Sequence, residues 1–242
     1  MANNKTLGIL EVGLVREDIS AGFDTYPQMF ETLLSAADPD LNYQTYTVVD
    51  GDMPDSPSQC DAWLITGSRH GVYEDHDWIE PLSDFVREAY ANDIPLVGIC
   101  FGHQLMAQAL GGKVIKSNKG WGVGVHHYDL KNQPDWMKSP NGKVKIHAFH
   151  QDHVVEVPEG AEVIASSEFC ENAGLIYGKK GISFQGHPEF QNDYQLALLK
   201  LFTPSLLPTD LTKPEIDKMN AGEVPDTAML AQWITRFLKE AV

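Results

Sequence analysis

Two spacings of apolar residues alternate along the first part of the chain, and each predicts a different element. Apolar or alternating runs predict strands over residues 5–12, 41–49, 61–66 and 94–99. Between them, helical spacing of apolar side chains predicts helices over residues 23–37, 78–91 and 101–110. Strands that alternate with helices in this order predict an α/β fold, in which helices cover both faces of a parallel sheet.

The pattern changes after residue 113. Short β runs occupy residues 122–130, 143–146, 154–157, 163–165 and 173–177, and the run after residue 181 leads into a histidine. Helical patterns then cover residues 193–202, 214–220 and 227–241. We expect one domain over residues 1–192 and a C-terminal helical extension over residues 193–242 that packs on it, because the last helix carries a single apolar stripe.

The strand predicted before residue 100 ends on a cysteine between two glycines, Gly98-Ile-Cys100-Phe-Gly102, and a helix follows at once. This is the layout of a nucleophile elbow, a sharp turn that exposes a reactive side chain at its apex and needs small neighbours. A thiol near a helix N-terminus is also favoured as thiolate. Cys100 is therefore the predicted nucleophile, whereas Cys60 and Cys170 are expected to be inert buried residues.

A second motif near residue 187 supplies a base. The run Gly181-Ile-Ser-Phe-Gln-Gly leads into His187-Pro-Glu189. Imidazole can take a proton from a thiol and return it to a leaving group, and a carboxylate on its other nitrogen fixes the tautomer. Residues i and i+2 of an extended chain point to the same side, so His187 and Glu189 can meet. The triplet alone is a weak signal, but with the elbow it predicts a Cys-His-Glu triad.

The two motifs, Gly98-Ile-Cys100-Phe-Gly102-His-Gln104 and His187-Pro-Glu189, resemble those of class I glutamine amidotransferases, the type attached to GMP synthetase. The resemblance spans roughly residues 5–192 and implies a flavodoxin-like sheet. It makes Cys100 the nucleophile, His187 the base and Glu189 its orienting partner. It also implies that Gln104 contacts bound glutamine and that the backbone N–H of Phe101 is one oxyanion donor.

Two segments depart from this family's usual pattern. The strand at residues 61–66 ends in Gly67-Ser68-Arg69, where family members commonly have Gly-Gly-Pro. Gly67 is the candidate for the second oxyanion donor, and Ser68 is a candidate substrate contact. The stretch Phe149-His150-Gln151-Asp152 replaces a frequent Ser-His-Gly-Asp, so His150 and Gln151 are expected beside the α-carboxylate and α-amino ends of the glutamyl group. Together with Gln185-Gly186-His187-Pro-Glu189, these departures resemble a branch that includes stand-alone γ-glutamyl peptidases.

The resemblance therefore implies a cysteine hydrolase that cleaves a γ-glutamyl amide bond through a γ-glutamyl thioester. One alternative is a stand-alone peptidase acting on γ-glutamyl peptides, and another is a non-catalytic regulatory member of the fold. The expected partner is a small γ-glutamyl substrate, and an amidotransferase would also pass ammonia to a separate synthase subunit. We expect no cofactor, and the chain contains no ATP loop of the Gly-x-x-x-x-Gly-Lys type.

Composition narrows the partners further. The 242 residues include 18 basic and 34 acidic side chains, and this net charge of −16 argues against nucleic acid and anionic membrane surfaces. No apolar run has membrane-spanning length and no secretory leader is visible. Three cysteines, an odd number without close spacing, favour a reducing compartment, so we expect a cytoplasmic protein. The histidines at 126–127 and at 147, 150 and 153 lack a nearby cysteine and predict pocket or surface residues rather than a metal site.

Overall fold

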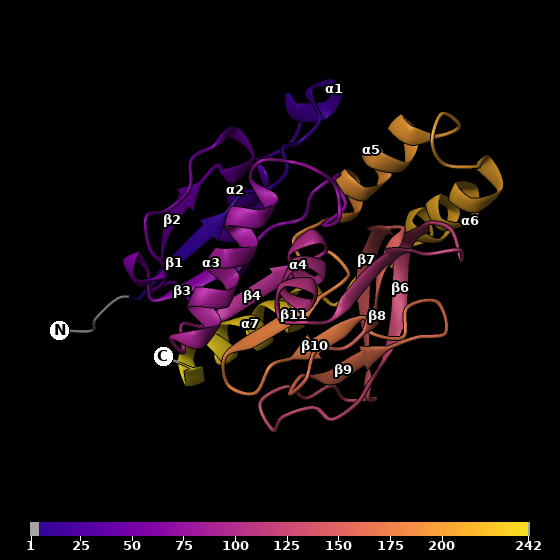
Figure 1. Cartoon of the computed structure of the whole chain (residues 1–242). Coiled ribbons are helices and arrows are strands. Elements are labelled where there is room, and N and C mark those ends of the chain that lie inside the picture. Colours follow the sequence, from indigo (N-terminus) through magenta and orange to yellow (C-terminus); the bar gives the residue numbers. More distant parts are fainter. Residues whose placement is uncertain (1–4, 242) are drawn as a thin grey trace.

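The centre of the molecule is a single mixed sheet, seen as the row of arrows in Figure 1. The computed structural model describes residues 5–241. Within them the strands of this sheet are β1 (Thr6–Leu10), β2 (Asn42–Tyr46), β3 (Ala62–Ile65), β4 (Leu96–Ile99), β6 (Gly122–Leu130), β7 (Lys143–His150), β9 (Glu162–Ser166), β10 (Gly174–Ile176) and β11 (Gly181–Phe184). Their order is β2-β1-β3-β4-β11-β10-β9-β6-β7. A separate antiparallel pair joins β5 (Lys113–Lys116) to β8 (Asp152–Glu156).

The type of strand pairing changes once across the large sheet. The strands from β2 to β11 pair in parallel, and those from β11 to β7 pair antiparallel. The parallel half follows from the alternation of strands and helices early in the chain, because parallel neighbours need a crossover connection. The carboxyl ends of β3 and β4 consequently lie at one edge, where sites form in open α/β sheets.

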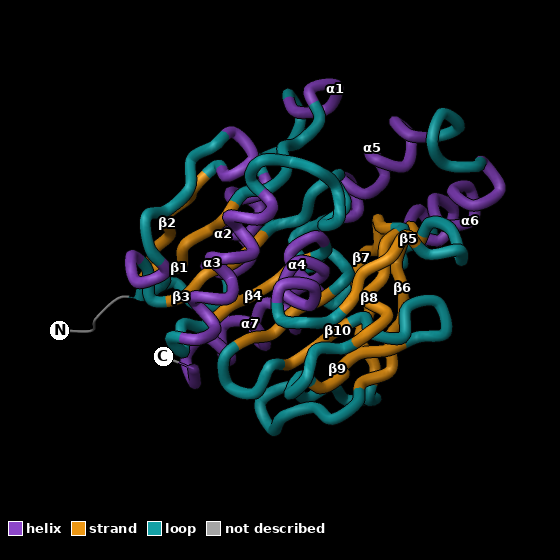
Figure 2. Tube along the Cα trace, in the orientation of Figure 1, coloured by secondary structure: helices purple, strands orange, loops and turns teal. Residues whose placement is uncertain are grey.

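Helices cover both faces of the parallel half, as the sequence predicts (Figure 2). On one face, α2 (Tyr26–Ser35) and α7 (Thr227–Ala241) bury apolar side chains with one side of the strands, in a core that includes Phe30, Trp233 and Leu64. On the other face, α3 (Ile79–Ala91) and α4 (Phe101–Ala109) pack with Trp63 and Ile65. Since α7 shares its core with the first strands, it forms part of the sandwich itself.

The remaining helices lie outside this sandwich. They are α1 (Glu17–Ser20), α5 (Asn192–Phe202), α6 (Thr209–Asn220) and the short 3-10 turns η1 (Val48–Asp50) and η2 (Pro57–Gln59). The segment 193–242 was predicted to be helical. The structure places α5, α6 and α7 within it, except that α5 begins one residue earlier, at Asn192. The division at residue 192 remains a proposal, and residues 1–4 and 242 of the two ranges lie outside the described part.

Local capping explains where α2 begins. The sequence predicts a helix from residue 23, but the helix starts at Tyr26 because Thr25 forms a capping box with Gln28. The Thr25 hydroxyl accepts the Gln28 backbone N–H, and the Gln28 side chain accepts the Thr25 backbone N–H. These bonds satisfy donors that the first helical turn otherwise leaves unpaired.

Two predicted boundaries are wrong. The predicted helix start at Pro214 is displaced, since α6 begins at Thr209 and carries Pro214 inside it. Proline there has no N–H for the carbonyl of Asp210, and Asp210 is exposed, so water can satisfy that group. The strand predicted to end at residue 146 continues to His150, because its pairing with β6 runs on to Gly122.

Candidate active site

Cys100 stands at the turn between β4 and α4 in a conformation that few residues adopt. Its φ is 53° and its ψ is −101°, so the backbone is in a strained region that is concentrated at functional sites. Two bonds from this turn reach the neighbouring strands. The Cys100 N–H donates to the carbonyl of Phe184 (2.9 Å), and the Gly102 N–H donates to the carbonyl of Thr66 (3.2 Å). The turn is therefore fixed from both sides.

The flanking glycines are required by close packing. A Cβ on Gly98 would lie 2.6 Å from the carbonyl oxygen of Gly102, and a Cβ on Gly102 would collide with the carbonyl of Ile65. Backbone atoms cannot move aside as a flexible side chain can. This confirms the prediction that an elbow at Cys100 needs small residues on either side.

His187 follows β11, the strand beside β4, and its ring is held on several sides. The Nδ1 atom lies 2.7 Å from Oε1 of Glu189, and both side chains are buried. The His187 backbone N–H donates to the carbonyl of His147 (2.8 Å). The ring of Phe190 stacks on the imidazole with centroids 4.0 Å apart and planes 7° apart. The predicted pairing of His187 with Glu189 is therefore present.

The charges around His187 favour its protonated form. Burial alone would lower the pKa of the imidazole, but the Cys100 thiolate and the Glu189 carboxylate outweigh burial and raise it. The Cys100 side chain is also a hydrogen-bond partner of the ring. Because Nδ1 faces Glu189, the nitrogen available to the thiol is Nε2. An imidazolium beside a cysteine sulfur is the arrangement that activates a cysteine nucleophile.

The predicted oxyanion donors meet at the same place. A Cβ on Gly67 would lie 2.8 Å from Cε1 of His187 and 3.6 Å from Cβ of Cys100, so this glycine contacts both. Phe101 is the first residue of α4, directly after Cys100. Within residues 5–241, neither the Gly67 nor the Phe101 backbone N–H donates to another group of the protein. Both can therefore donate to a bound oxygen.

A pair of glutamine side chains links the turn to β8 and to the segment that follows β11. Nε2 of Gln104 donates to the carbonyl of Asp152 (3.1 Å) and to Oε1 of Gln185 (3.2 Å). Nε2 of Gln185 in turn lies 3.8 Å from Sγ of Cys100. The sequence analysis assigned no role to Gln185, although its position two residues before His187 in an extended segment was a usable signal.

The other predicted substrate contacts have different surroundings. The Ser68 hydroxyl accepts the N–H of His70 (3.2 Å), and the carbonyl of Gln151 accepts the N–H of Ser117 (3.1 Å). The ring of His150 packs against other aromatic rings, among them His153 (5.1 Å between centroids). In the described residues no contact joins these three side chains to Cys100, so their roles toward a substrate remain predictions.

A wide groove adjoins the candidate oxyanion glycine. It has a volume of about 1110 Å³, and its walls include Gly13, Arg16, Arg69, His76 and Trp78. A Cβ on Gly13 would lie 2.6 Å from the carbonyl oxygen of Gly67, so the groove begins directly beside the turn that carries this glycine. The groove has room for a group much larger than ammonia.

Comparison with known proteins agrees with the motifs and the fold. The profile of the family "Glutamine amidotransferase class-I" matches residues 40–203. A glutamine amidotransferase-like protein of Schizosaccharomyces pombe is 32% identical over 97% of this chain and 98% of its own length. Gamma-glutamyl peptidase 3 of Arabidopsis thaliana is 27% identical over 89% of this chain and 90% of its own.

A solved structure agrees in fold. The glutamine amidotransferase of Methylobacillus flagellatus superimposes with a TM-score of 0.74 over 98% of this chain and 94% of its own, at 18% sequence identity. The architecture is thus that of class I glutamine amidotransferases. The chain belongs to the class I glutamine amidotransferase family, whose members are hydrolytic and amide-transferring enzymes. No helix within residues 5–241 is both long and apolar enough to cross a membrane.

Proposed function

We propose that this protein hydrolyses a γ-glutamyl amide bond with Cys100 as nucleophile, His187 as general base and acid, and Glu189 as the group that orients His187. The observation that carries this proposal is the strained Cys100 turn beside an imidazole whose Nδ1 bonds Glu189 at 2.7 Å. Nucleophile, base and orienting carboxylate in this order form the standard constellation for acyl transfer.

In the first step, Sγ of the Cys100 thiolate forms a bond to the γ-carbonyl carbon of the substrate. Charge moves onto the carbonyl oxygen, which the N–H groups of Gly67 and Phe101 stabilise. The tetrahedral intermediate collapses by breaking the carbon–nitrogen bond, and Nε2 of His187 gives its proton to the leaving nitrogen. The products are a γ-glutamyl thioester on Cys100 and a free amine or ammonia.

In the second step, water attacks the thioester while the now neutral His187 takes one of its protons. The same N–H groups stabilise the second oxyanion, and the carbon–sulfur bond breaks. Glutamate leaves, and the pair of thiolate and imidazolium is restored. Glu189 keeps the imidazole in the tautomer that leaves Nε2 facing the thiol throughout.

The substrate class favoured by the groove is a substituted γ-glutamyl amide, in which a peptide or amine replaces ammonia. The groove is lined by Gly13, which packs against the carbonyl of Gly67, and its volume of about 1110 Å³ is far more than ammonia would fill. The similarity to a γ-glutamyl peptidase over most of both chains supports the same choice. A stand-alone γ-glutamyl peptidase is therefore our preferred form of the hydrolase.

The test is glutamate release by the purified chain alone. Glutamine and a panel of γ-glutamyl dipeptides and γ-glutamyl amines serve as substrates, Cys100→Ala is the blank, and Cys60→Ser is the matched cysteine control. We expect release from a substituted compound by the wild type and by Cys60→Ser, and none by Cys100→Ala. Turnover by Cys100→Ala near the wild-type rate would refute the mechanism.

Two other outcomes separate the alternatives. Release from glutamine only when a copurifying synthase is added would make the protein an amidotransferase that delivers ammonia. No release from any compound, with Cys100 still selectively alkylated, and no synthase retained on the protein would identify a regulatory member of the fold. Either result would overturn the peptidase assignment.

A further inference from the structure

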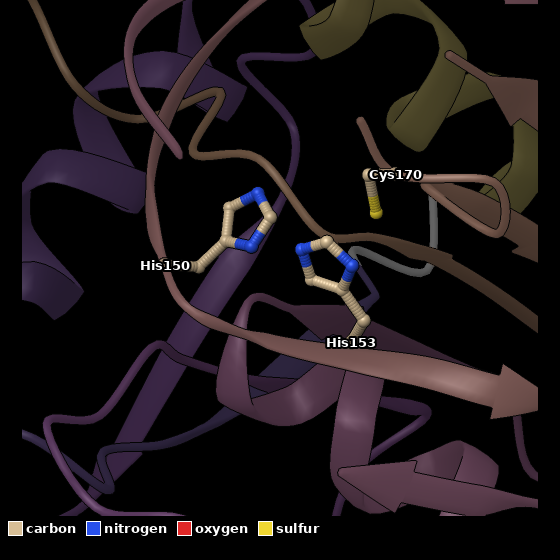
Figure 3. Close-up of side chains that lie close together, drawn as sticks. All are labelled: His150, His153 and Cys170. Atoms are coloured by element: carbon tan, nitrogen blue, oxygen red, sulfur yellow. The ribbon is translucent and has the colours of Figure 1, made fainter. Parts of the chain in front are cut away.

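Three potential metal ligands meet beside Asp152, the residue whose carbonyl accepts the hydrogen bond from Gln104. His150 ends β7, His153 lies in β8, and Cys170 lies in the loop between β9 and β10. One ligand atom from each lies within 4.8 Å of the other two. Figure 3 shows the ring of His153 between the ring of His150 and the thiol of Cys170. The cluster thus brings together residues from three segments.

The polar atoms of this cluster are buried without partners. His150, His153 and Cys170 are 3%, 6% and 1% exposed. Neither ring nitrogen of His150 has a hydrogen-bond partner, and Nε2 of His153 has none either. Cys170 is a free thiol. Buried polar atoms almost always have a partner, so several unpaired ones in one place call for a ligand.

Hydrogen bonds hold the three segments in position. The Cys170 N–H donates to Oγ of Ser167 (3.1 Å), and the Ser167 N–H donates to the carbonyl of Cys170 (2.9 Å), which closes the turn around the thiol. Nδ2 of Asn172 donates to the carbonyl of Val154 (3.0 Å) and ties this loop to β8. Ligands on such a fixed frame lose little conformational freedom when an ion binds.

We propose that His150, His153 and Cys170 bind a Zn²⁺ ion, with the fourth coordination position left to water. Imidazole and thiolate together favour zinc over calcium or magnesium, which prefer oxygen ligands. Tetrahedral bonds to nitrogen and sulfur place ligand atoms about 3.3 to 3.6 Å apart, so small rotations of these side chains complete the site. Binding releases the Cys170 thiol proton to solvent as the sulfur–zinc bond forms.

A second cluster provides a contrast. His70, Glu74 and His76 also gather their ligand atoms, but Glu74 is exposed and its Oε2 already contacts a nitrogen of each histidine, at 3.1 Å and 2.9 Å. The two histidines are thus already paired with the same carboxylate. His76 is therefore a suitable control position.

Such an ion would anchor one wall of the candidate active site. His150 and His153 flank Asp152, whose carbonyl accepts the bond from Gln104. Zinc would join this turn to the loop of Cys170 and restrict its movement. The sequence spacing of the histidines could not indicate this, because Cys170 reaches them only through the fold.

The experiment begins with untagged full-length protein. Its zinc content after exhaustive dialysis is measured by mass spectrometry, and we expect about one ion per chain. Cys170→Ser and His153→Gln should lose most of this zinc, whereas His76→Gln should retain it. Equal zinc in wild type and Cys170→Ser, or loss of zinc in His76→Gln, would overturn the site.

A second measurement needs no variant and so does not depend on whether a variant folds. Wild-type protein freed of metal is titrated with Co²⁺, and we expect a charge-transfer absorption from a thiolate–cobalt bond, together with a higher melting temperature. The ring of Phe169 packs edge-on against both histidines, with centroids 5.8 Å from His150 and 5.1 Å from His153. Cobalt binding without that absorption, or no binding at all, would show that the cluster is only this aromatic packing.

Discussion

The imidazole of His187 and the ring of Phe190 lie almost parallel, with centroids 4.0 Å apart and an angle of 7° between their planes. Oε1 of Glu189 lies 2.7 Å from Nδ1 of the same imidazole. The stacking fixes the plane of the ring and the hydrogen bond fixes its rotation. Together they determine where Nε2 points.

Phe190→Leu should therefore slow the reaction beyond its effect on stability. We expect kcat to fall by roughly tenfold with little change in KM, because the ring is free to tilt away from the thiol. The free energy of unfolding should fall by about 1–2 kcal/mol. Phe30→Leu is the matched control, since Phe30 is equally buried in the main core. If both variants lower kcat alike, Phe190 acts only through stability.

Glu189→Gln should change the pH profile as well as the rate. Burial lowers the pKa of His187, while the Cys100 thiolate and the Glu189 carboxylate raise it. Removing the carboxylate charge lowers that pKa, so the imidazolium is lost earlier as pH rises. We expect kcat to fall by about 10²- to 10⁴-fold and the alkaline limb of kcat/KM to move to lower pH.

A second histidine–glutamate pair provides the control for that variant. Oε1 of Glu223 lies 2.7 Å from Nε2 of exposed His127. Glu223→Gln should leave the rate and the alkaline limb unchanged. An unshifted limb in Glu189→Gln would contradict the charge balance assigned to His187.

Gly67→Ala should disturb the site without unfolding the protein. The new Cβ would lie 2.8 Å from Cε1 of His187, so either the imidazole or the oxyanion loop must shift. We expect kcat to fall by about 100-fold or more, as when one oxyanion donor is lost. Gly22→Ala, whose Cβ has no neighbour closer than 3.7 Å, should keep wild-type activity. A wild-type kcat in Gly67→Ala would show that Gly67 is not an oxyanion donor.

His103 should make the fold sensitive to acid. Burial lowers the pKa of this histidine to about 3, and its Nδ1 contacts Oγ of Ser183 at 2.8 Å. The unfolded chain, with a histidine pKa near 6.5, binds the proton more readily, so stability is lost as pH falls below that value. We expect this residue to account for roughly 2 kcal/mol of the loss between pH 6 and pH 4.5.

Urea unfolding of wild type and His103→Gln across this range measures the effect. The variant should show a shallower decline in the free energy of unfolding, whatever its stability at neutral pH. Parallel curves of unfolding free energy against pH for the two proteins would show that the pKa of His103 is the same in the folded and unfolded states.

The sequence was sufficient where a function depends on neighbours in the chain. Glycines at 98 and 102 and the apolar run before them predict the Cys100 turn, and the extended segment predicts that Glu189 meets His187. Both follow from short-range geometry. The pairing of β4 with β11, which brings the two motifs together, depends on contacts between distant segments and came from the family resemblance instead.

Other features needed the folded chain. No local pattern places Cys170 beside His153, and none shows that the ring of His150 packs against that histidine. The start of α6 was missed because proline is frequent at the first position of a helix, so Pro214 suggested a helix start. In the structure the helix begins five residues earlier and includes Pro214. Side-chain environment and long-range packing therefore account for most of the errors.

The backbone N–H of Cys100 is bonded to β11, the strand before His187, and that of Gly102 to Thr66, which lies between β3 and Gly67. The positions of the Cys100 sulfur and the His187 imidazole are thus set by three adjacent central strands, while the groove walls come from the connections after β1, β2 and β3. Insertions or substitutions in those connections can change which compounds are accepted without moving the sulfur or the imidazole. Under the proposed function, substrate selectivity and the bond-breaking chemistry are therefore carried by separate parts of the fold.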